Sequence, residues 1–426
     1  MNIFETLLLT FPLILVLLSI AFMPLMFSKF WHKNEFRILS IITICSIILM
    51  FLILDNTCKI LNHAIIEDYV PFIITLFTLY LLSHGIHIKI KLSSGTKQNA
   101  LFLIIASIFS SIIGTTGASM LLLRPFLEMN KNRQKKTHLL VFFIFLVSNI
   151  GGLLTPLGDP PLLLGYLHGI EFSWFFKNLV FYWLLYIFTC VLIMVFVDKH
   201  IIKNEKNIKV DEKFELKITG IGNIFLTILT VFVLFIDFDF VNKSNIPQIY
   251  LKCSLLLIFC LISFVYSKKV NHEKIDFAPF SEVAKTFLVI FIVIAPVLHI
   301  LETNSHIIHE YIRNISKGSD ESIVYFWLCS LTSSFLDNAP SYLLFFNMAG
   351  GNANELMNVY PNILQAISIS AVVMGAMTYI GNAPNMMVRS IALKKGIKMP
   401  SFIGYILWSC LVILPISFFI SFILYK

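Results

Sequence analysis

Twelve apolar stretches, separated by short polar segments, account for most of the chain. Each is close to, or longer than, the roughly 20 residues that a membrane-spanning helix needs. The pattern predicts an all-α polytopic membrane protein. The stretches cover residues 3–27, 38–54, 70–88, 99–126, 139–167, 172–197, 221–240, 246–266, 283–301, 322–348, 363–393 and 402–425.

The composition also indicates that lipid is the solvent. Hydrophobic residues make up 58% of the chain, charged residues 13%, and the mean hydropathy is +0.85. A soluble fold of 426 residues could not hide this much apolar surface. The first stretch has no basic segment before it and no small-residue cleavage site, so we interpret it as a retained helix. The net charge of +8 lies in short loops that set topology, so no nucleic-acid partner is expected.

Two of the stretches carry the same interrupted motif. Residues 152–163 read GLLTPLGDPPLL and residues 375–386 read GAMTYIGNAPNM, so Gly, Thr, Gly, Asp or Asn, and Pro recur at an offset of 223. Gly and Pro should break each helix near its middle. Interrupted hydrophobic segments at matching positions of two halves are typical of a transporter's binding site.

The basic residues indicate which loops share a side of the membrane, because cytoplasmic loops are enriched in Lys and Arg. If every stretch crossed, the basic segments 89–97 and 131–136 would face opposite sides. They face one side if the stretch 99–126 is a re-entrant hairpin, and we treat 322–348 as its counterpart. Most of the 32 Lys and Arg residues then lie on the predicted cytoplasmic face, in loops 29–37, 89–97, 131–136, 199–217, 268–274 and 394–398.

Each half then has five transmembrane helices and one re-entrant hairpin, which gives ten helices and two hairpins in all. Because five is odd, the second half is inverted relative to the first, and this inverted repeat is a transporter plan. Residues 305–317 are expected to form a short amphipathic interfacial helix. The predicted units are residues 1–197 (hairpin 99–126, broken helix 139–167), a cytoplasmic linker at 198–220, and residues 221–426 (hairpin 322–348, broken helix 363–393).

The two predicted hairpins have related tips. Residues 114–119 read GTTGAS and residues 336–341 read LDNAPS, at an offset of 222. Irregular backbone at membrane depth needs protein or a water-filled cavity to satisfy its N–H and C=O groups. Two tips that meet two broken helices would supply that enclosure, with half-helix ends and free carbonyls for a small ion. Discontinuous helices are therefore expected at a central binding site.

The segments 149–161 (NIGGLLTPLGDPP), 337–340 (DNAP) and 378–385 (TYIGNAPN) resemble the ion-transporter superfamily. Within it, the chain is most similar to sodium/proton antiporters of the NhaD type and to the citrate transporters grouped beside them. The resemblance covers nearly the whole chain and implies a homodimer, in which each protomer has a scaffold part and a mobile part holding the hairpins. Divalent-anion symporters of this superfamily carry Ser-Asn-Thr at both tips. This chain has Thr-Thr in one tip and Asp-Asn in the other, which argues against dicarboxylate binding.

Two carboxylates within apolar stretches are the strongest candidates for ion binding. Near the bilayer centre, Asp159 and Asp337 would each cost roughly 3 kcal/mol, so we interpret them as functional. Each half contributes one, because Asp159 aligns with Asn382 and Asp337 aligns with Thr115. Two nearby carboxylates disfavour each other's ionisation, so a proton can compete with Na⁺ for the same oxygens. The sequence thus predicts a sodium/proton antiporter with Na⁺ at these two aspartates.

Each candidate also has a structural interpretation. The two aspartates and Asn382 precede half-helices and can be N-caps. The threonines can hydrogen-bond to their own helices, and Asn149 can satisfy backbone groups. The full set of candidates for ion or substrate binding is Asp159, Asp337, Asn338, Thr155, Thr378, Asn382, Thr115, Thr116, Asn149, Gly158 and Gly381.

The alternative function is sodium- or proton-coupled transport of citrate or a dicarboxylate, which the same architecture would serve. An enzyme is not expected, because no G-x-S-x-G or H-E-x-x-H motif occurs. The seven cysteines lack C-x-x-C spacing, so they indicate neither a metal site nor a disulfide framework. No cofactor is predicted beyond transported Na⁺ and H⁺. The expected partners are small ions or a small carboxylate, together with the lipid bilayer. The expected location is a bacterial inner membrane, with both termini on the periplasmic side.

Overall fold

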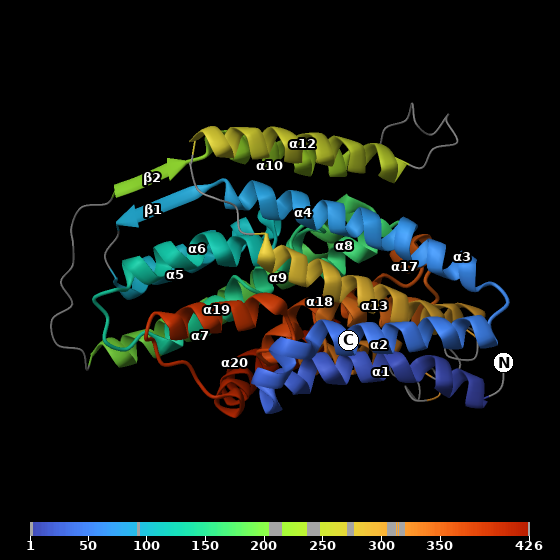
Figure 1. Ribbon diagram of the computed structural model, residues 1–426. Coiled ribbons are helices and arrows are strands. Elements are labelled where there is room, and N and C mark those ends of the chain that lie inside the picture. The colour runs from blue at the N-terminus through green and yellow to red at the C-terminus, as the bar shows by residue number, and fades with distance from the viewer. Residues whose placement is uncertain are drawn as a thin grey trace.

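A computed structural model describes residues 3–91, 94–203, 215–236, 248–270, 277–304, 312, 314 and 320–424 of the chain. Apart from residues 312 and 314, the predicted interfacial helix at 305–317 lies outside the described residues. So do residues 204–214 of the predicted linker. Most of the described helices run roughly along one direction (Figure 1).

Helices make up nearly all of the first half of the chain, from residue 3 to residue 202. A short π-helical segment (His63–Tyr69) precedes α4, and a 3₁₀ turn, η2 (Ile150–Leu154), separates α7 from α8. The α-helices of this half are α1 (Ile3–Met26), α2 (Ser28–Ile53), α3 (Thr57–Asn62), α4 (Val70–His84), α5 (Thr96–Ile113), α6 (Thr115–Met129), α7 (Thr137–Leu146), α8 (Pro160–Leu167) and α9 (Phe172–Ile202).

The second half is built in the same way. A 3₁₀ turn, η3 (Gly375–Met377), separates α18 from α19. The α-helices are α10 (Ile221–Phe235), α12 (Gln248–Val270), α13 (Ala278–Thr303), α15 (Glu321–Phe335), α16 (Asn338–Met348), α17 (Ala353–Asn358), α18 (Pro361–Met374), α19 (Ala383–Lys394) and α20 (Phe402–Leu424).

The helices have the length and surface of membrane-spanning segments. Within the described ranges, nine are long and apolar enough to cross a bilayer: 4–24, 33–53, 57–84, 96–113, 137–154, 172–202, 248–268, 280–301 and 402–423. Large apolar side chains on their outer faces are exposed, such as Phe196 at 77% and Leu411 at 75%. Lipid is the solvent that accepts such a surface. The chain is therefore a multi-pass, predominantly α-helical membrane protein, as predicted.

The predicted helix breaks are confirmed at the level of the backbone. The stretch expected at 99–126 consists of α5 and α6, which meet at Gly114, and the stretch expected at 322–348 consists of α15 and α16, which meet at residues 336–337. Both broken helices are also interrupted where the Gly-Thr-Gly motif lies, after η2 and after η3. Non-helical backbone thus occurs at four places within apolar segments.

Two short strands depart from the all-α prediction. Strand β1 (His87–Lys91) pairs antiparallel with β2 (Glu215–Thr219), with His87 opposite Thr219 and Lys91 opposite Glu215. The ribbon extends at one end of the molecule (Figure 1). The hydropathy and charge pattern instead places residues 87–88 at the end of an apolar stretch, residues 89–91 in a basic loop and residues 215–219 in the linker. Their alternation of polar and apolar residues is the period of a strand, and this signal could have identified them.

The four irregular places meet at the centre because the two halves interlock. Helix α8 of the first half packs on α16 of the second, and η2 packs against α5, α9 and α18. One continuous apolar core, which includes Phe142, Phe145, Ile367 and Val372, surrounds this region. These four side chains have no exposed surface, so they separate the polar centre from the surrounding lipid.

Candidate functional site

The two broken segments have closely similar backbones. In each, a 3₁₀ turn is followed by extended residues, and a half-helix begins immediately after Asp159 or Asn382. Glycines allow the backbone to fold back on itself. A Cβ atom at Gly158 would lie 2.2 Å from the Gly152 carbonyl oxygen, and one at Gly381 would lie 2.7 Å from the Gly375 carbonyl oxygen. Gly158 and Gly381 therefore position backbone rather than supply a side chain.

The threonines of the motif cross-link each loop to a neighbouring helix. The Thr155 hydroxyl donates to the Ser111 carbonyl near the end of α5. The Thr378 hydroxyl donates to the Ser334 carbonyl near the end of α15, at 2.6 Å. The expected alternative, a hydrogen bond within the threonine's own helix, is therefore wrong. Both contacts span 44 residues, so the same cross-link occurs in both halves.

The two tips are also equivalent, with a register that differs by one residue from the predicted offset. Gly114 is the N-cap of α6 and Asp337 is the N-cap of α16. They are 223 residues apart, the same separation as Asp159 and Asn382. The φ angle of Gly114 is 81°, which a side chain would disfavour. The residues that follow the caps, Thr115 and Asn338, are thus the equivalent pair.

Asp159 is the point on which the four irregular places converge. Its side chain is 2% exposed. The carboxylate accepts hydrogen bonds from the Thr115 hydroxyl at 2.5 Å and from the Asn338 amide. The Asn382 amide donates to it at 3.2 Å. The N-cap interpretation of the carboxylate is wrong, because it makes no capping hydrogen bond to α8.

Amide side chains extend this centre to the second broken segment. Asn382 also donates to the Ser148 carbonyl and to the Asn149 side-chain oxygen, both at 3.2 Å. Asn149 donates to the Asn385 side-chain oxygen at 2.8 Å, and Asn385 in turn donates to the Gly375 and Thr378 carbonyls. The backbone-satisfying role considered for Asn149 is real, because it also donates to the Ile144 carbonyl.

Asn385 is absent from the predicted set, although it belongs to the second copy of the motif. It follows Asn382 by three residues and is fully buried. Its place in the repeated motif, one turn after the helix break, is the sequence signal that could have identified Asn385.

Asp337 lies in a different environment from Asp159. Its carboxylate accepts a hydrogen bond from the Ala339 backbone N–H at 3.3 Å, so it caps α16. It is half-buried, and no hydrogen bond joins it to Asp159 in the described residues. Thr116 is half-buried too and is not among the donors to the Asp159 carboxylate. The structure thus gathers Thr115, Asn338 and Asn382 around Asp159 through hydrogen bonds, whereas Asp337 and Thr116 are not among the hydrogen-bond partners of this carboxylate in the described residues.

Among the described residues, one side-chain oxygen in the centre has no hydrogen-bond partner. The side chain of Asn338 is fully buried and donates its amide to Asp159, while its Oδ1 accepts no hydrogen bond. Buried polar atoms are nearly always paired, so an orphaned oxygen beside a carboxylate is suited to a cation or to a bound water. No cluster of three His, Cys, Asp or Glu residues that could hold a metal ion exists in the part of the chain that the structure describes. Oxygen ligands from amides, hydroxyls and carbonyls are what a hard cation accepts instead.

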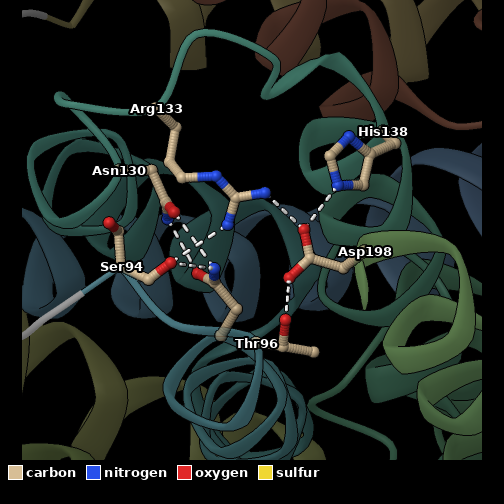
Figure 2. Close-up of polar contacts among 7 residues, drawn as sticks. Ser94, Thr96, Asn130, Arg133, His138 and Asp198 are labelled. Atoms are coloured by element: carbon tan, nitrogen blue, oxygen red, sulfur yellow. Dashed lines mark hydrogen bonds and ion pairs between the residues drawn. The ribbon is translucent and has the colours of Figure 1, made fainter. Parts of the chain in front are cut away.

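A second buried polar cluster lies near one end of α9 (Figure 2). Arg133 forms an ion pair with Asp198 at 2.5 Å, and both side chains are fully buried. His138 lies 2.8 Å from the same carboxylate oxygen, and Thr96 donates to the other oxygen at 2.6 Å. The Arg133 guanidinium also donates to the Ser94 carbonyl. Sequence reasoning assigned Arg133 to a solvated basic loop, since its partners lie far away in the chain.

These observations define a multi-pass membrane protein with a buried polar centre at two pairs of helix breaks, which is an architecture of secondary transporters. Residues 4–425 match the family described as "Putative citrate transport" (CitMHS_2). The chain belongs to this family, in agreement with the resemblance read from its motifs. No curated protein matches the chain.

Proposed function

We propose that the protein is a secondary active ion transporter that exchanges Na⁺ for H⁺ at Asp159. The observation that carries this proposal is the burial of a carboxylate whose hydrogen-bond partners, Thr115, Asn338 and Asn382, are all neutral. Among the described residues, no Lys, Arg or His forms an ion pair with it. A buried carboxylate without a positive partner is costly, so it must be neutralised by a proton or by a bound cation.

Proton and cation are alternatives at such a site. A protonated Asp159 donates one hydrogen bond and needs no counter-charge. An ionised Asp159 offers its oxygens to Na⁺, and the unpaired Asn338 Oδ1 and the Thr115 hydroxyl oxygen belong to side chains that already contact this carboxylate and could act as further ligands. Mutually exclusive occupancy couples the two ions, because Na⁺ can bind only when the proton leaves. Na⁺ is the cargo in this scheme, and the chain supplies oxygen ligands and a titratable group.

We also propose that the two halves, 1–197 and 221–426, are inverted repeats joined by a linker at 198–220. In this proposal α5 with α6 and α15 with α16 are the two re-entrant hairpins, and ten other segments cross the membrane. The recurrence of caps and threonine contacts supports it. Alternating access would then move the hairpins relative to a scaffold. A homodimer in a bacterial inner membrane, with periplasmic termini, completes this proposal.

Cation-coupled transport of citrate is the second candidate, and the description of the matching family as putative citrate transport is the observation that supports it. In that case Asp159 would hold the coupling cation rather than exchange it for a proton. Both candidates share the ion site and differ in whether an organic anion moves. The difference is open to direct measurement.

The test uses purified protein in liposomes that hold a pH gradient, with Na⁺, Li⁺, K⁺ and citrate added in turn. The parent should release protons on addition of Na⁺. Asp159→Asn should abolish this release, because an amide can neither ionise nor exchange a proton for Na⁺.

Asp320→Asn is the matched control, because Asp320 is an N-cap of α15 that accepts from Ser322 and lies outside the centre. It should retain parental exchange, since Asn caps about as well as Asp. Near-parental exchange in Asp159→Asn would contradict the proposal. Saturable, Na⁺-dependent uptake of labelled citrate by the parent would establish the second candidate instead.

A further inference from the structure

The two carboxylate oxygens of Asp159 have different hydrogen-bond partners. Its Oδ1 accepts from the Thr115 hydroxyl at 2.5 Å and from the Asn382 amide at 3.2 Å. The close donor to its Oδ2 is the Asn338 amide, while the Asn382 nitrogen lies 3.5 Å from this oxygen. A proton therefore meets different surroundings on the two oxygens, because the donors on each side differ in how freely they can turn.

The Asn382 amide cannot turn without losing further contacts. Its nitrogen also donates to the Ser148 backbone carbonyl at 3.2 Å. A backbone carbonyl oxygen only accepts, so the side of the amide that faces it must be the nitrogen. Rotation of the amide would place its oxygen against both this carbonyl and the Asp159 carboxylate. Asn382 is therefore a permanent donor to Asp159.

The two further amides of the centre are fixed in the same way. Asn149 donates to the Ile144 carbonyl at 2.9 Å. Asn385 donates to two backbone carbonyls, at 2.8 Å and 2.9 Å. Each of these nitrogens thus faces a backbone acceptor, whatever the charge of the carboxylate.

Asn338 lacks such an anchor in the described part of the chain. Its side chain is fully buried, and its nitrogen donates to Asp159 Oδ2. Within the described ranges, no backbone carbonyl accepts from that nitrogen, and its Oδ1 has no hydrogen-bond partner. Turning the amide by half a rotation exchanges nitrogen and oxygen at nearly constant shape, so it changes one hydrogen bond only, the one to Asp159. The charge on Asp159 therefore decides which side of Asn338 faces it.

We propose that Asn338 turns with the protonation state of Asp159. Its nitrogen donates to the ionised carboxylate, and its oxygen accepts from the carboxyl O–H once a proton is bound. The proton comes from solvent, forms an O–H bond with Oδ2 and returns to solvent on release. Oδ2 is the oxygen that takes it, because Oδ1 keeps both of its donors in either state. Asn338 is thus the acceptor that stabilises the protonated form.

The same reversal serves a bound cation. Na⁺ at Oδ2 needs the amide oxygen rather than the nitrogen, because amide oxygens are ligands for hard cations and N–H groups are not. This part rests on the proposed exchange, whereas the proton response does not. Asn338 is the first residue of α16, and α16 packs on α8, which begins after Asp159. The amide therefore reports to the second tip whether the carboxylate of the first half is neutralised.

The direct test is infrared difference spectroscopy of the full-length purified protein, acidified in Na⁺-free buffer. Acidification should produce a carboxyl band that is absent in Asp159→Asn. It should also lower the frequency of a side-chain amide carbonyl band that is absent in Asn338→Leu, because that carbonyl begins to accept a hydrogen bond. Both changes should have the same pH midpoint. A carboxyl band that titrates without any change in the Asn338 band would overturn the proposal.

The midpoint itself separates a turning amide from a fixed donor. Asn382→Leu should raise the pH midpoint of the carboxyl band by about one unit or more, because a donor is lost from the ionised form only. Asn338→Leu should move it by roughly half a unit or less, because a partner is lost from both forms. Asn347→Leu is the matched control, since Asn347 is a buried amide of α16 that donates to the Leu343 carbonyl of its own helix. It should leave the midpoint and both bands unchanged.

Equal upward shifts in Asn338→Leu and Asn382→Leu would also overturn the proposal, since both amides would then be fixed donors. So would absence of the carboxyl band at every pH at which the protein stays folded, because Asp159 would then have no protonated form. An intact acid response of both bands, in a parent protein that releases no protons on addition of Na⁺, would contradict the proposed exchange and uphold this inference.

Discussion

The broken segment of the first half ends in Asp159, and that of the second half ends in Asn382 at the equivalent place. In both segments the second glycine of the motif lies against the carbonyl of the first, and the threonine hydroxyl donates to a helix carbonyl 44 residues earlier. The side chains at the ends of the two segments differ: the carboxylate receives three side-chain donors, whereas the amide is itself one of those donors. The comparison teaches that the shared backbone builds the enclosure, and that a single residue difference decides where the charge lies.

The cap positions of the two tips also differ, but here the acid lies in the second half. Asp337 is the acid of the second tip, and Gly114 occupies the equivalent cap position in the first. The Asp337 carboxylate is used by its own helix, whereas the next residue, Asn338, reaches across to the first half. A carboxylate in an apolar segment can therefore also have a structural role, because its oxygen accepts a capping hydrogen bond from its own helix.

The largest effect is expected when the two residues are exchanged, as Asp159→Asn with Asn382→Asp in one chain. We expect Na⁺-dependent proton release to stay lost in this double variant, because the carboxylate is moved away from its three donors. A carboxylate at 382 would face the Ser148 carbonyl and the Asn149 side-chain oxygen, which are acceptors. Proton release from liposomes measures the effect. Recovery to near-parental exchange would mean that the two positions are interchangeable and that the donor arrangement does not matter.

A smaller effect is expected from the glycines that the two segments share. Gly158→Ala should lower the thermal unfolding midpoint more than Gly381→Ala, because its added Cβ would approach backbone at 2.2 Å rather than 2.7 Å. Overpacking of this kind costs about 1–3 kcal/mol. Gly404→Ala in α20 is the control, since its nearest neighbour is the flexible Ser401 side chain at 3.1 Å. Equal midpoints for all three variants would show that the backbone contacts do not constrain the fold.

Local patterns were enough to predict much of the fold. Gly and Pro inside apolar segments predicted the breaks after η2 and η3, and the repeated motif predicted that they are equivalent. The burial of Asp159 followed from its place in an apolar stretch. The alternation in 87–91 and 215–219 was readable as strand, but lysines in both segments favoured a loop interpretation.

Contacts between distant segments could not be predicted in the same way. The donation from Asn338 to Asp159 spans 179 residues, and the pairing of Arg133 with Asp198 depends on how α9 packs. Local sequence does not specify which of several buried polar groups meet. The one-residue error at the tips has a related cause, because the adjacent polar residues, Thr115-Thr116 and Asp337-Asn338, allow two alignments.

The central claim is that Asp159 holds either a proton or Na⁺, and direct Na⁺ binding tests it. Calorimetric titration of purified protein in buffers of different ionisation enthalpy gives both the Na⁺ affinity and the number of protons released. At acidic pH we expect about one proton to be released per Na⁺ bound, and the Na⁺ affinity to fall about tenfold for each unit by which the pH is lowered. Asp159→Asn should show neither effect. Na⁺ binding with the same affinity and proton release in Asp159→Asn as in the parent would contradict the account.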